Sequence, residues 1–227
     1  VELWGGSFAR YRALVQHGGS TGKFDYFVSG NLFFDDGYRD YSKSHVGNLF
    51  AKGGYLDAKN DLTFSLTHIN NKLTGNGPLP RSRLRRDRSE VYTQPDIFEP
   101  DLWFANSQYQ RVLGPGLSLS ANGYARLLDV DQFNLDVEEI VDARTNQLGW
   151  GTSLELSYQG TALGRAFSLT LGGSYSGASL DHLIAEQEED EEDEEDEDDE
   201  LFALALAGGA RTHRGSSANL QMWVIRR

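Results

Sequence analysis

The sequence alternates apolar and polar residues with a period of two, which is the pattern of β-strands whose two faces differ. The alternation is clearest over 117–127, where Leu119 and Ala121 are separated by Ser120. It returns at 62–67, 147–159 and 167–175, and less regular segments of similar length occur at 9–16, 24–34, 46–56, 101–112, 201–207 and 217–225. These segments predict an all-β fold of about ten strands with no helix.

The connections between these segments alternate strictly between short and long. Short connections with turn-forming residues lie near 17–23, 57–60, 113–116, 160–165 and 208–216, and long ones lie near 35–45, 73–100, 128–146 and 177–200. This order predicts an antiparallel up-and-down sheet with tight turns at one end and long loops at the other. Outer-membrane β-barrels have the same asymmetry, with short periplasmic turns and long extracellular loops.

The alternation alone is compatible with two environments. In a soluble β-sandwich the apolar face packs on a core, whereas in a transmembrane β-barrel it contacts lipid and the polar face lines the lumen. The expected strands of ~9–12 residues can span a bilayer at a tilt, and aromatic residues gather near their ends as in interfacial girdles. We therefore favour an antiparallel up-and-down transmembrane β-barrel, with the sandwich as the alternative.

The formal charge of −13 is concentrated in one segment. Residues 186–200 contain 14 of the 34 acidic residues, so the remainder, with 20 acidic and 21 basic residues, is nearly neutral. Repulsion among so many like charges predicts a disordered, solvated loop over 180–200, and the parity of the connections places it outside the cell. The run lacks the Asp/Asn/Gly spacing of a calcium-binding loop.

Residues that often carry chemistry show no matching pattern. The absence of cysteine excludes disulfide scaffolds, thiolate zinc sites and cysteine nucleophiles. The five histidines lie in different segments without metal-ligand spacing, and no serine stands in a Gly-x-Ser-x-Gly nucleophile elbow beside a matching His/Asp set. We therefore expect neither an enzyme nor a cofactor or metal site.

Several segments carry a more specific signal through their order and spacing. They are Gly6–Arg12, Gly18–Gly19, Phe24–Gly30, Asp36–Asp40, Leu56–Phe64 and Gly75–Pro80. Over roughly residues 5–175 these segments resemble the first barrel strands of TonB-dependent outer-membrane receptors. The resemblance implies a location in the bacterial outer membrane and active uptake of a ferric siderophore or a similar iron chelate, driven by the TonB complex.

The chain departs from that family in extent. Family members have a plug domain with a TonB box and a barrel of 22 strands, whereas no segment here resembles the plug and only about ten strands are expected. We therefore expect a receptor fragment, which would reach the TonB complex only through a plug domain missing from this chain. Receptor-like strands and loops would occupy 1–179, the acidic loop 180–200, and a final hairpin of unassigned relationship 201–227.

Two other functions stay open at this point. A small self-contained outer-membrane barrel would act as a passive pore or a structural protein, and it would close on itself because unpaired strand edges are costly in lipid. A barrel enzyme is the third interpretation, and the missing Ser/His/Asp set argues against it.

The candidate ligand-binding residues lie in two of the long connections. The connection 73–100 carries Arg81, Arg83, Arg85, Arg86 and Arg88, and the connection 35–45 carries Tyr38, Arg39 and Tyr41. Guanidinium groups match carboxylate and phosphate oxygens, so the arginines would attract an anionic ferric chelate or a lipopolysaccharide phosphate. The alternatives are a solvated charge run and an ordinary turn. No aromatic interleaving accompanies the arginines, so no nucleic-acid partner is expected.

A second set of candidates lies at strand positions that alternate with outward apolar residues. These predicted lumen-facing residues are Arg10, Arg12, Asn122, Arg126 and Glu155. In a receptor such residues would contact the plug or a passing ligand, and the alternative is that they only hydrate the interior.

Overall fold

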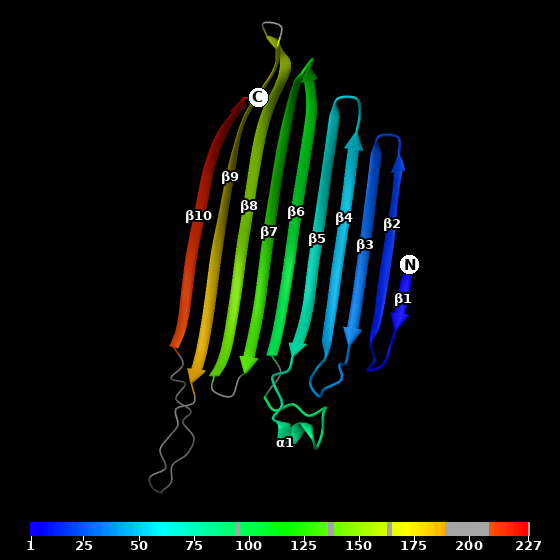
Figure 1. Cartoon of the computed structure of the whole chain (residues 1–227), viewed down its shortest axis with the longest axis vertical. Coiled ribbons are helices and arrows are strands. Elements are labelled where there is room, and N and C mark those ends of the chain that lie inside the picture. Colours follow the sequence, from blue (N-terminus) through cyan, green and yellow to red (C-terminus); the bar gives the residue numbers. More distant parts are fainter. Residues whose placement is uncertain (94–95, 136–138, 163–164, 189–208, 227) are drawn as a thin grey trace.

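The computed structural model describes residues 1–93, 96–135, 139–162, 165–188 and 209–226. Ten antiparallel strands follow one another in chain order in one sheet (Figure 1). They are β1 (Glu2–Gly5), β2 (Tyr11–Thr21), β3 (Phe24–Asp35), β4 (Ser44–Leu56), β5 (Asn60–Gly75), β6 (Asp96–Gly114), β7 (Leu117–Leu135), β8 (Glu139–Ala162), β9 (Arg165–Glu188) and β10 (Gly209–Arg226). One helical turn, α1 (Arg81–Leu84), lies between β5 and β6. The predicted all-β, antiparallel up-and-down fold is confirmed.

The strand register divides the side chains between two faces of unlike character. Residues that pair across neighbouring strands share a face, so Ser120 lies on the same face as Gln110 and Glu155, which are opposite it. Leu119 is opposite Leu156 and lies on the other face. We call the first the polar face and the second the apolar face.

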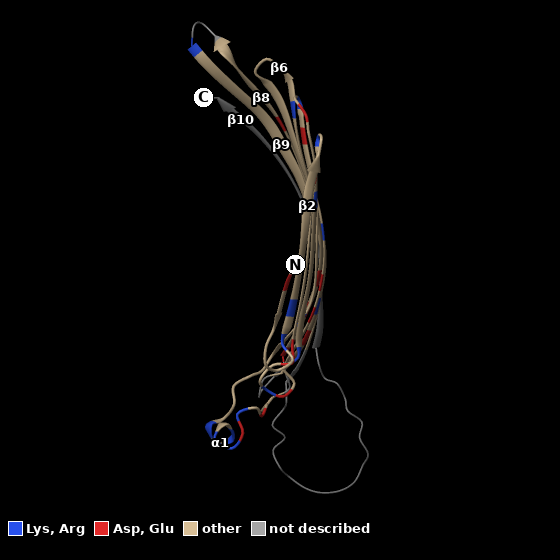
Figure 2. Ribbon diagram, turned by 90° about the vertical axis from the view of Figure 1, so that its right-hand side faces the viewer, with Lys and Arg blue, Asp and Glu red and all other residues tan. Residues whose placement is uncertain are grey.

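The sheet is a single curved layer, as Figure 2 shows from its edge. Among the described residues no hydrophobic side chain is buried, and Leu154 on the apolar face is 56% exposed. A sandwich would cover one face with a second sheet, so the soluble-sandwich alternative does not describe this fold. Backbone hydrogen bonds and cross-strand pairs, rather than a core, hold the layer together.

The sheet is open, with β1 and β10 at its two edges. β1 covers only one end of β2, where Glu2–Gly5 pairs with Tyr11–Leu14. A self-contained barrel needs its first and last strands to pair, and no such pairing exists between β1 and β10 as described. The arrangement is that of part of a barrel wall.

The strands are longer than the sequence predicts. The predicted long loop over 128–146 is wrong, because β7 continues to Leu135 and β8 begins at Glu139. Here charged residues occupy the apolar face and hide the alternation: Asp131 and Arg144 are opposite each other, with Oδ1 and Nε 2.8 Å apart. Such cross-strand ion pairs stabilise the pairing of β7 with β8 in a region where the sequence shows no alternation of apolar and polar residues. β6 to β9 therefore reach 19–24 residues instead of the predicted ~9–12.

Three further local predictions are wrong. The sequence does not predict β1, it predicts no helix at α1, and it predicts a turn over 208–216 where β10 runs unbroken from Gly209. β9 also continues to Glu188, so the first part of 180–200 is strand. The predicted strand at 201–207 and residues 189–200 of the acidic run lie outside the described residues.

No helix in the described part of the chain is long and apolar enough to cross a membrane.

One carboxylate organises the turn between β4 and β5. Asp57 Oδ1 accepts hydrogen bonds from the backbone N–H groups of Lys59 and Asn60, both at 2.8 Å. Its Oδ2 accepts the hydroxyl of Tyr55 at 2.9 Å. These donors, the Lys59 N–H first, favour the charged carboxylate and hold the pKa of Asp57 well below its usual range.

We predict that Asp57→Ala loosens the β4–β5 hairpin at neutral pH. Because the folded state lowers the pKa of Asp57, its stabilisation is present above the unfolded value of about 4 and is lost as pH falls through the folded value. Hydrogen exchange of the Asn60 amide in the full chain should be faster in the variant at neutral pH. Asp61→Ala, whose carboxylate forms no hydrogen bond among the described residues, is the control, and equal exchange in both variants would contradict this role.

Candidate functional site at the loop end

Because successive strands run in opposite directions, every second connection lies at the same end of the sheet, and the long connections share one end. The connections between β1 and β2, between β3 and β4, and between β5 and β6 lie at the lower end in Figure 1; their described residues are 6–10, 36–43 and 76–93. Short turns, such as 22–23 and 57–59, lie at the opposite end. We call the lower end the loop end. It contains all the predicted ligand-binding residues.

Arg39 ties two of these loops together. Its Nη1 donates a hydrogen bond to the carbonyl oxygen of Gly77 at 2.9 Å, and its Nη2 donates to that of Glu90 at 3.0 Å. Beside it, the backbone N–H of Asp40 donates to the carbonyl oxygen of Ser89 at 2.8 Å. These contacts assign Arg39 a positioning role in the loops, while the direct ligand contact expected from the sequence stays a prediction.

The two tyrosines of the 36–43 loop are exposed. Tyr38 packs edge-on against Phe8, with ring centroids 5.7 Å apart, and the backbone N–H of Asp36 donates to the carbonyl oxygen of Phe8 at 3.0 Å. Tyr41 is 73% exposed. The connection 6–10 thus supports this loop from one side, and both tyrosine rings are accessible from solution.

The arginine-rich segment around α1 is exposed and mostly unpaired. Arg83 forms an ion pair with Glu90, with Nη1 and Oε1 2.5 Å apart, and its guanidinium lies 5.0 Å from the ring centroid of Tyr92. Within the part of the chain that the structure describes, the other four arginine side chains form no hydrogen bond or ion pair. We call these four the arginine patch: Arg81, Arg85, Arg86 and Arg88.

The acidic residue inside this segment does not neutralise the arginine patch through a direct contact. Asp87 Oδ1 accepts hydrogen bonds from the hydroxyl and the backbone N–H of Ser89, at 2.6 and 2.8 Å. These bonds, the hydroxyl first, hold the pKa of Asp87 below its usual value. The carboxylate stays ionised but is bound to the following turn, so it is not a partner of the four guanidinium groups of the arginine patch.

Four of the five predicted lumen-facing residues lie on the polar face, and each bonds to a neighbour there. The bonds are Arg12 to Asn31 (2.7 Å), Asn122 to Ser153 (3.3 Å), Arg126 to Gln147 (2.6 Å) and Ser157 to Glu155 (3.1 Å). The fifth, Arg10, lies in the connection 6–10 and pairs with Asp35 at 2.5 Å. That the polar face encloses a lumen stays a prediction, because the sheet is open.

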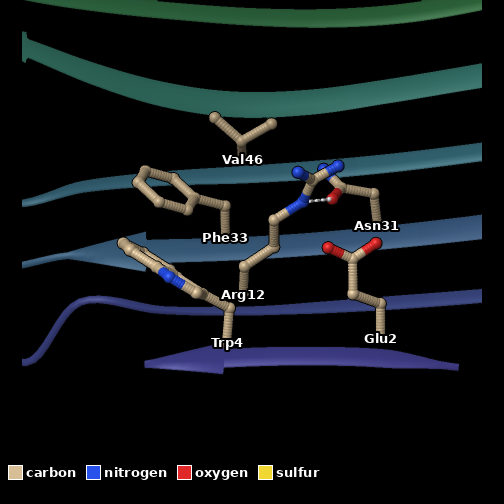
Figure 3. A pocket seen from close by; sticks show the side chains of 6 residues that line it. All are labelled: Glu2, Trp4, Arg12, Asn31, Phe33 and Val46. Atoms are coloured by element: carbon tan, nitrogen blue, oxygen red, sulfur yellow. Dashed lines mark hydrogen bonds between the residues drawn. The ribbon is translucent and has the colours of Figure 1, made fainter. Parts of the chain in front are cut away.

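A hollow of about 520 Å³ lies on the polar face beside the β1 edge (Figure 3). It is lined by Glu2, Trp4, Arg12, Asn31, Phe33 and Val46. Arg12 stands between two aromatic residues, because it is opposite Trp4 on β1 and Phe33 on β3. Sequence reasoning singles out only Arg12 here, because β1 is too short to show a period of two.

Aromatic pairs form two rows on the apolar face. Towards the loop end the ring-centroid separations are 4.9 Å for Tyr11–Phe34, 6.1 Å for Phe34–His45, 4.0 Å for His68–Trp103 and 5.1 Å for Trp150–Tyr175. Towards the turn end they are 5.0 Å for Phe24–Tyr55 and 6.4 Å for Tyr158–Phe167. On β3 the rows lie ten residues apart, the separation expected of two interfacial girdles.

Beyond the loop-end row, the apolar face becomes charged. Lys72 pairs with Glu99, and Asp101 Oδ1 lies 3.4 Å from Nε2 of His68, which belongs to the loop-end row. The Asp131–Arg144 pair continues this band on β7 and β8. The described residues contain no group of three or more acidic or histidine side chains that could hold a metal ion. The strands therefore extend past the apolar band into surroundings that tolerate charge.

No protein-family model and no curated protein matches this sequence. Solved structures are similar to it in fold. The unliganded ferric citrate transporter FecA matches with a TM-score of 0.73 and 15% identity, over 96% of this chain and 32% of its own. Pseudomonas aeruginosa FpvA bound to heterologous pyoverdines matches with 0.72 and 13%, over 99% and 34%. The RagAB peptide transporter matches with 0.61 and 10%, over 95% and 29%.

These identities show a likeness of fold alone. The chain spans about a third of the length of each matched structure. Its open ten-stranded sheet corresponds to part of the β-structure of these three proteins. The fold is therefore similar to a part of the folds of these proteins.

We predict that Arg39→Gln separates the two loops that its guanidinium joins. The variant loses the hydrogen bonds to residues 77 and 90, so the bond from Asp40 to Ser89 should open more often. Hydrogen exchange of the Asp40 amide is the measurement. Arg85→Gln removes a guanidinium without a described partner and should leave this exchange unchanged, and an equal effect of both changes would show that Arg39 does not position the loops.

Proposed function

We propose that this chain is a segment of an outer-membrane receptor of the TonB-dependent type, and that it takes part in uptake of a ferric siderophore or a similar iron chelate. The fold likeness to FecA and FpvA supports the receptor class. The TonB complex would act through a plug domain that is not part of these 227 residues. Lipid would contact the apolar face, and the loop end would face the exterior.

The arginine patch is the observation that carries the proposed ligand class. Its four guanidinium groups are exposed at the loop end and free of described partners. Ferric chelates built on carboxylate or similar oxygen ligands carry negative charge, which guanidinium groups bind by paired, charge-assisted hydrogen bonds. A cluster of like positive charges also raises the rate of encounter with an anion. Tyr38 and Tyr41 supply exposed aromatic surface on the adjoining loop.

The two faces of the sheet support the membrane location. Hydrocarbon solvates the apolar face without cost, whereas the ion pairs beyond the loop-end row need water or headgroups around them. Open strand edges in lipid leave backbone groups unpaired, at several kcal/mol each. β1 and β10 would therefore pair with further strands in the membrane, as in a larger barrel.

Removing the arginine patch should weaken chelate binding. We predict that R81Q/R85Q/R86Q/R88Q lowers the affinity of the refolded full chain for ferric citrate by about tenfold, equivalent to about 1.4 kcal/mol. It should also flatten the salt dependence of binding, because fewer charges act on the anion. Retention of radioactive iron citrate by the protein in detergent measures both quantities.

A control variant that removes two lysines tests whether loss of positive charge away from the arginine patch also weakens binding. K52Q/K59Q removes positive charges from β4 and from the turn end, away from the arginine patch, and should leave the affinity unchanged. Unchanged binding in the quadruple arginine variant, or an equal decrease in both variants, would overturn the assignment. Repeating the titration with ferric pyoverdine tests whether the patch distinguishes between iron chelates.

The membrane assignment makes a separate prediction on stability. Leu119→Arg or Leu154→Arg should destabilise the protein refolded into vesicles by about 2–4 kcal/mol if the residue lies near mid-bilayer. Ser120→Arg and Ser153→Arg, on the polar face, should cost far less. Denaturant unfolding followed by tryptophan fluorescence gives the comparison, and equal costs on both faces would remove the lipid-facing assignment.

A further inference from the structure

The hollow on the polar face has two aromatic walls. Trp4 and Phe33 stand on strands separated only by β2, so their Cα atoms are about 10 Å apart. Gly6 lies beside the Trp4 ring, because a Cβ built at Gly6 would lie 3.5 Å from it. Figure 3 shows both rings on one side of Arg12, whose guanidinium is turned away from them towards Asn31. The Arg12 guanidinium therefore does not lie between the two rings, which both line the hollow.

The polar groups of the hollow are only partly used within the protein. Arg12 Nε donates to Asn31 Oδ1 at 2.7 Å, while its two Nη groups have no described partner. The carboxylate of Glu2 also forms no hydrogen bond or ion pair with a described residue. The hollow thus offers several donors on one side and an acceptor on another, beside apolar ring faces.

The opposite charges in the lining of the hollow favour a neutral ligand over an anion or a cation. One guanidinium and one carboxylate make the lining electrically neutral, so Glu2 would repel an anion and Arg12 would repel a cation. A neutral ring that carries several hydroxyl groups avoids both penalties: its hydroxyls donate to Glu2 and accept from Arg12, and its C–H faces pack on Trp4 and Phe33. A pyranose has this chemistry. We propose that the hollow is a saccharide-binding site, independent of whether the chain carries iron chelates.

Calorimetric titration of the refolded full chain with maltotriose tests this site. An amine-oxide detergent is required, because a sugar-headed detergent would compete. We expect saturable binding, weakened about threefold to tenfold by Glu2→Gln or by Arg12→Gln, since each loses a hydrogen bond that the charged group strengthens. Trp4→Ala should abolish it. Lys52→Gln, which removes an exposed charge elsewhere on the same face, is the control and should bind as the parent does.

Titration with two other ligands tests where the saccharide comes from and whether the ligand is neutral or anionic. The first is a phosphorylated core oligosaccharide freed from lipopolysaccharide, which represents the sugars of the membrane surface. If this anionic oligosaccharide binds and maltotriose does not, the assignment of a neutral ligand fails. Salicylate tests the anionic alternative, and tighter binding of salicylate overturns the proposal. So does the absence of saturable maltotriose binding to chains whose circular dichroism is that of the parent. Iron citrate binding by the same preparation reports on the proposed function separately.

Discussion

The continuous antiparallel ladder of backbone hydrogen bonds is the interaction on which everything else in this molecule depends. It links all ten strands in chain order, and no buried hydrophobic side chain in the described residues supplements it. Because side chains alternate between faces, the register alone decides that Leu119 is on one face and Ser120 on the other. A slip of one residue would exchange them. The lipid-facing assignment, the hollow and the loop end all follow from this register.

The same ladder creates the candidate binding surface. Strict up-and-down order returns the chain to one end after every second strand, so residues 36–43 and 76–93 become neighbours although they are far apart in sequence. Arg39 then joins them, while Asp87 accepts hydrogen bonds from Ser89. Four of the five arginines thus concentrate positive charge with no ion-pair partner among the described residues, which is an arrangement that can bind an anion.

Much of this fold can be predicted from the sequence, because regular alternation marks the central strands and turn residues mark the short connections. Strands are missed where the residues on the two faces of the sheet no longer differ in polarity. Asp131 and Arg144 place charge on the apolar face, so 128–146 lacks a hydropathy signal although it is strand. The arginine patch is evident from composition, but the role of Arg39 is not, since backbone carbonyls from residues 77 and 90 carry no sequence signature. Trp4 is not predicted as a site residue because β1 has only four residues, too few to show an alternation of period two.

The arrangement of β5 and β6 bears on how tightly a ligand can be held. Their ladder continues to the pairing of Gly75 with Asp96, and Arg39 fastens the intervening connection again at residues 77 and 90. The arginines are therefore carried on a short span between two fixed points. A ligand that bridges several of them sacrifices less conformational entropy than it would on an untethered loop of the same length. Affinity could then exceed what exposed charge alone provides.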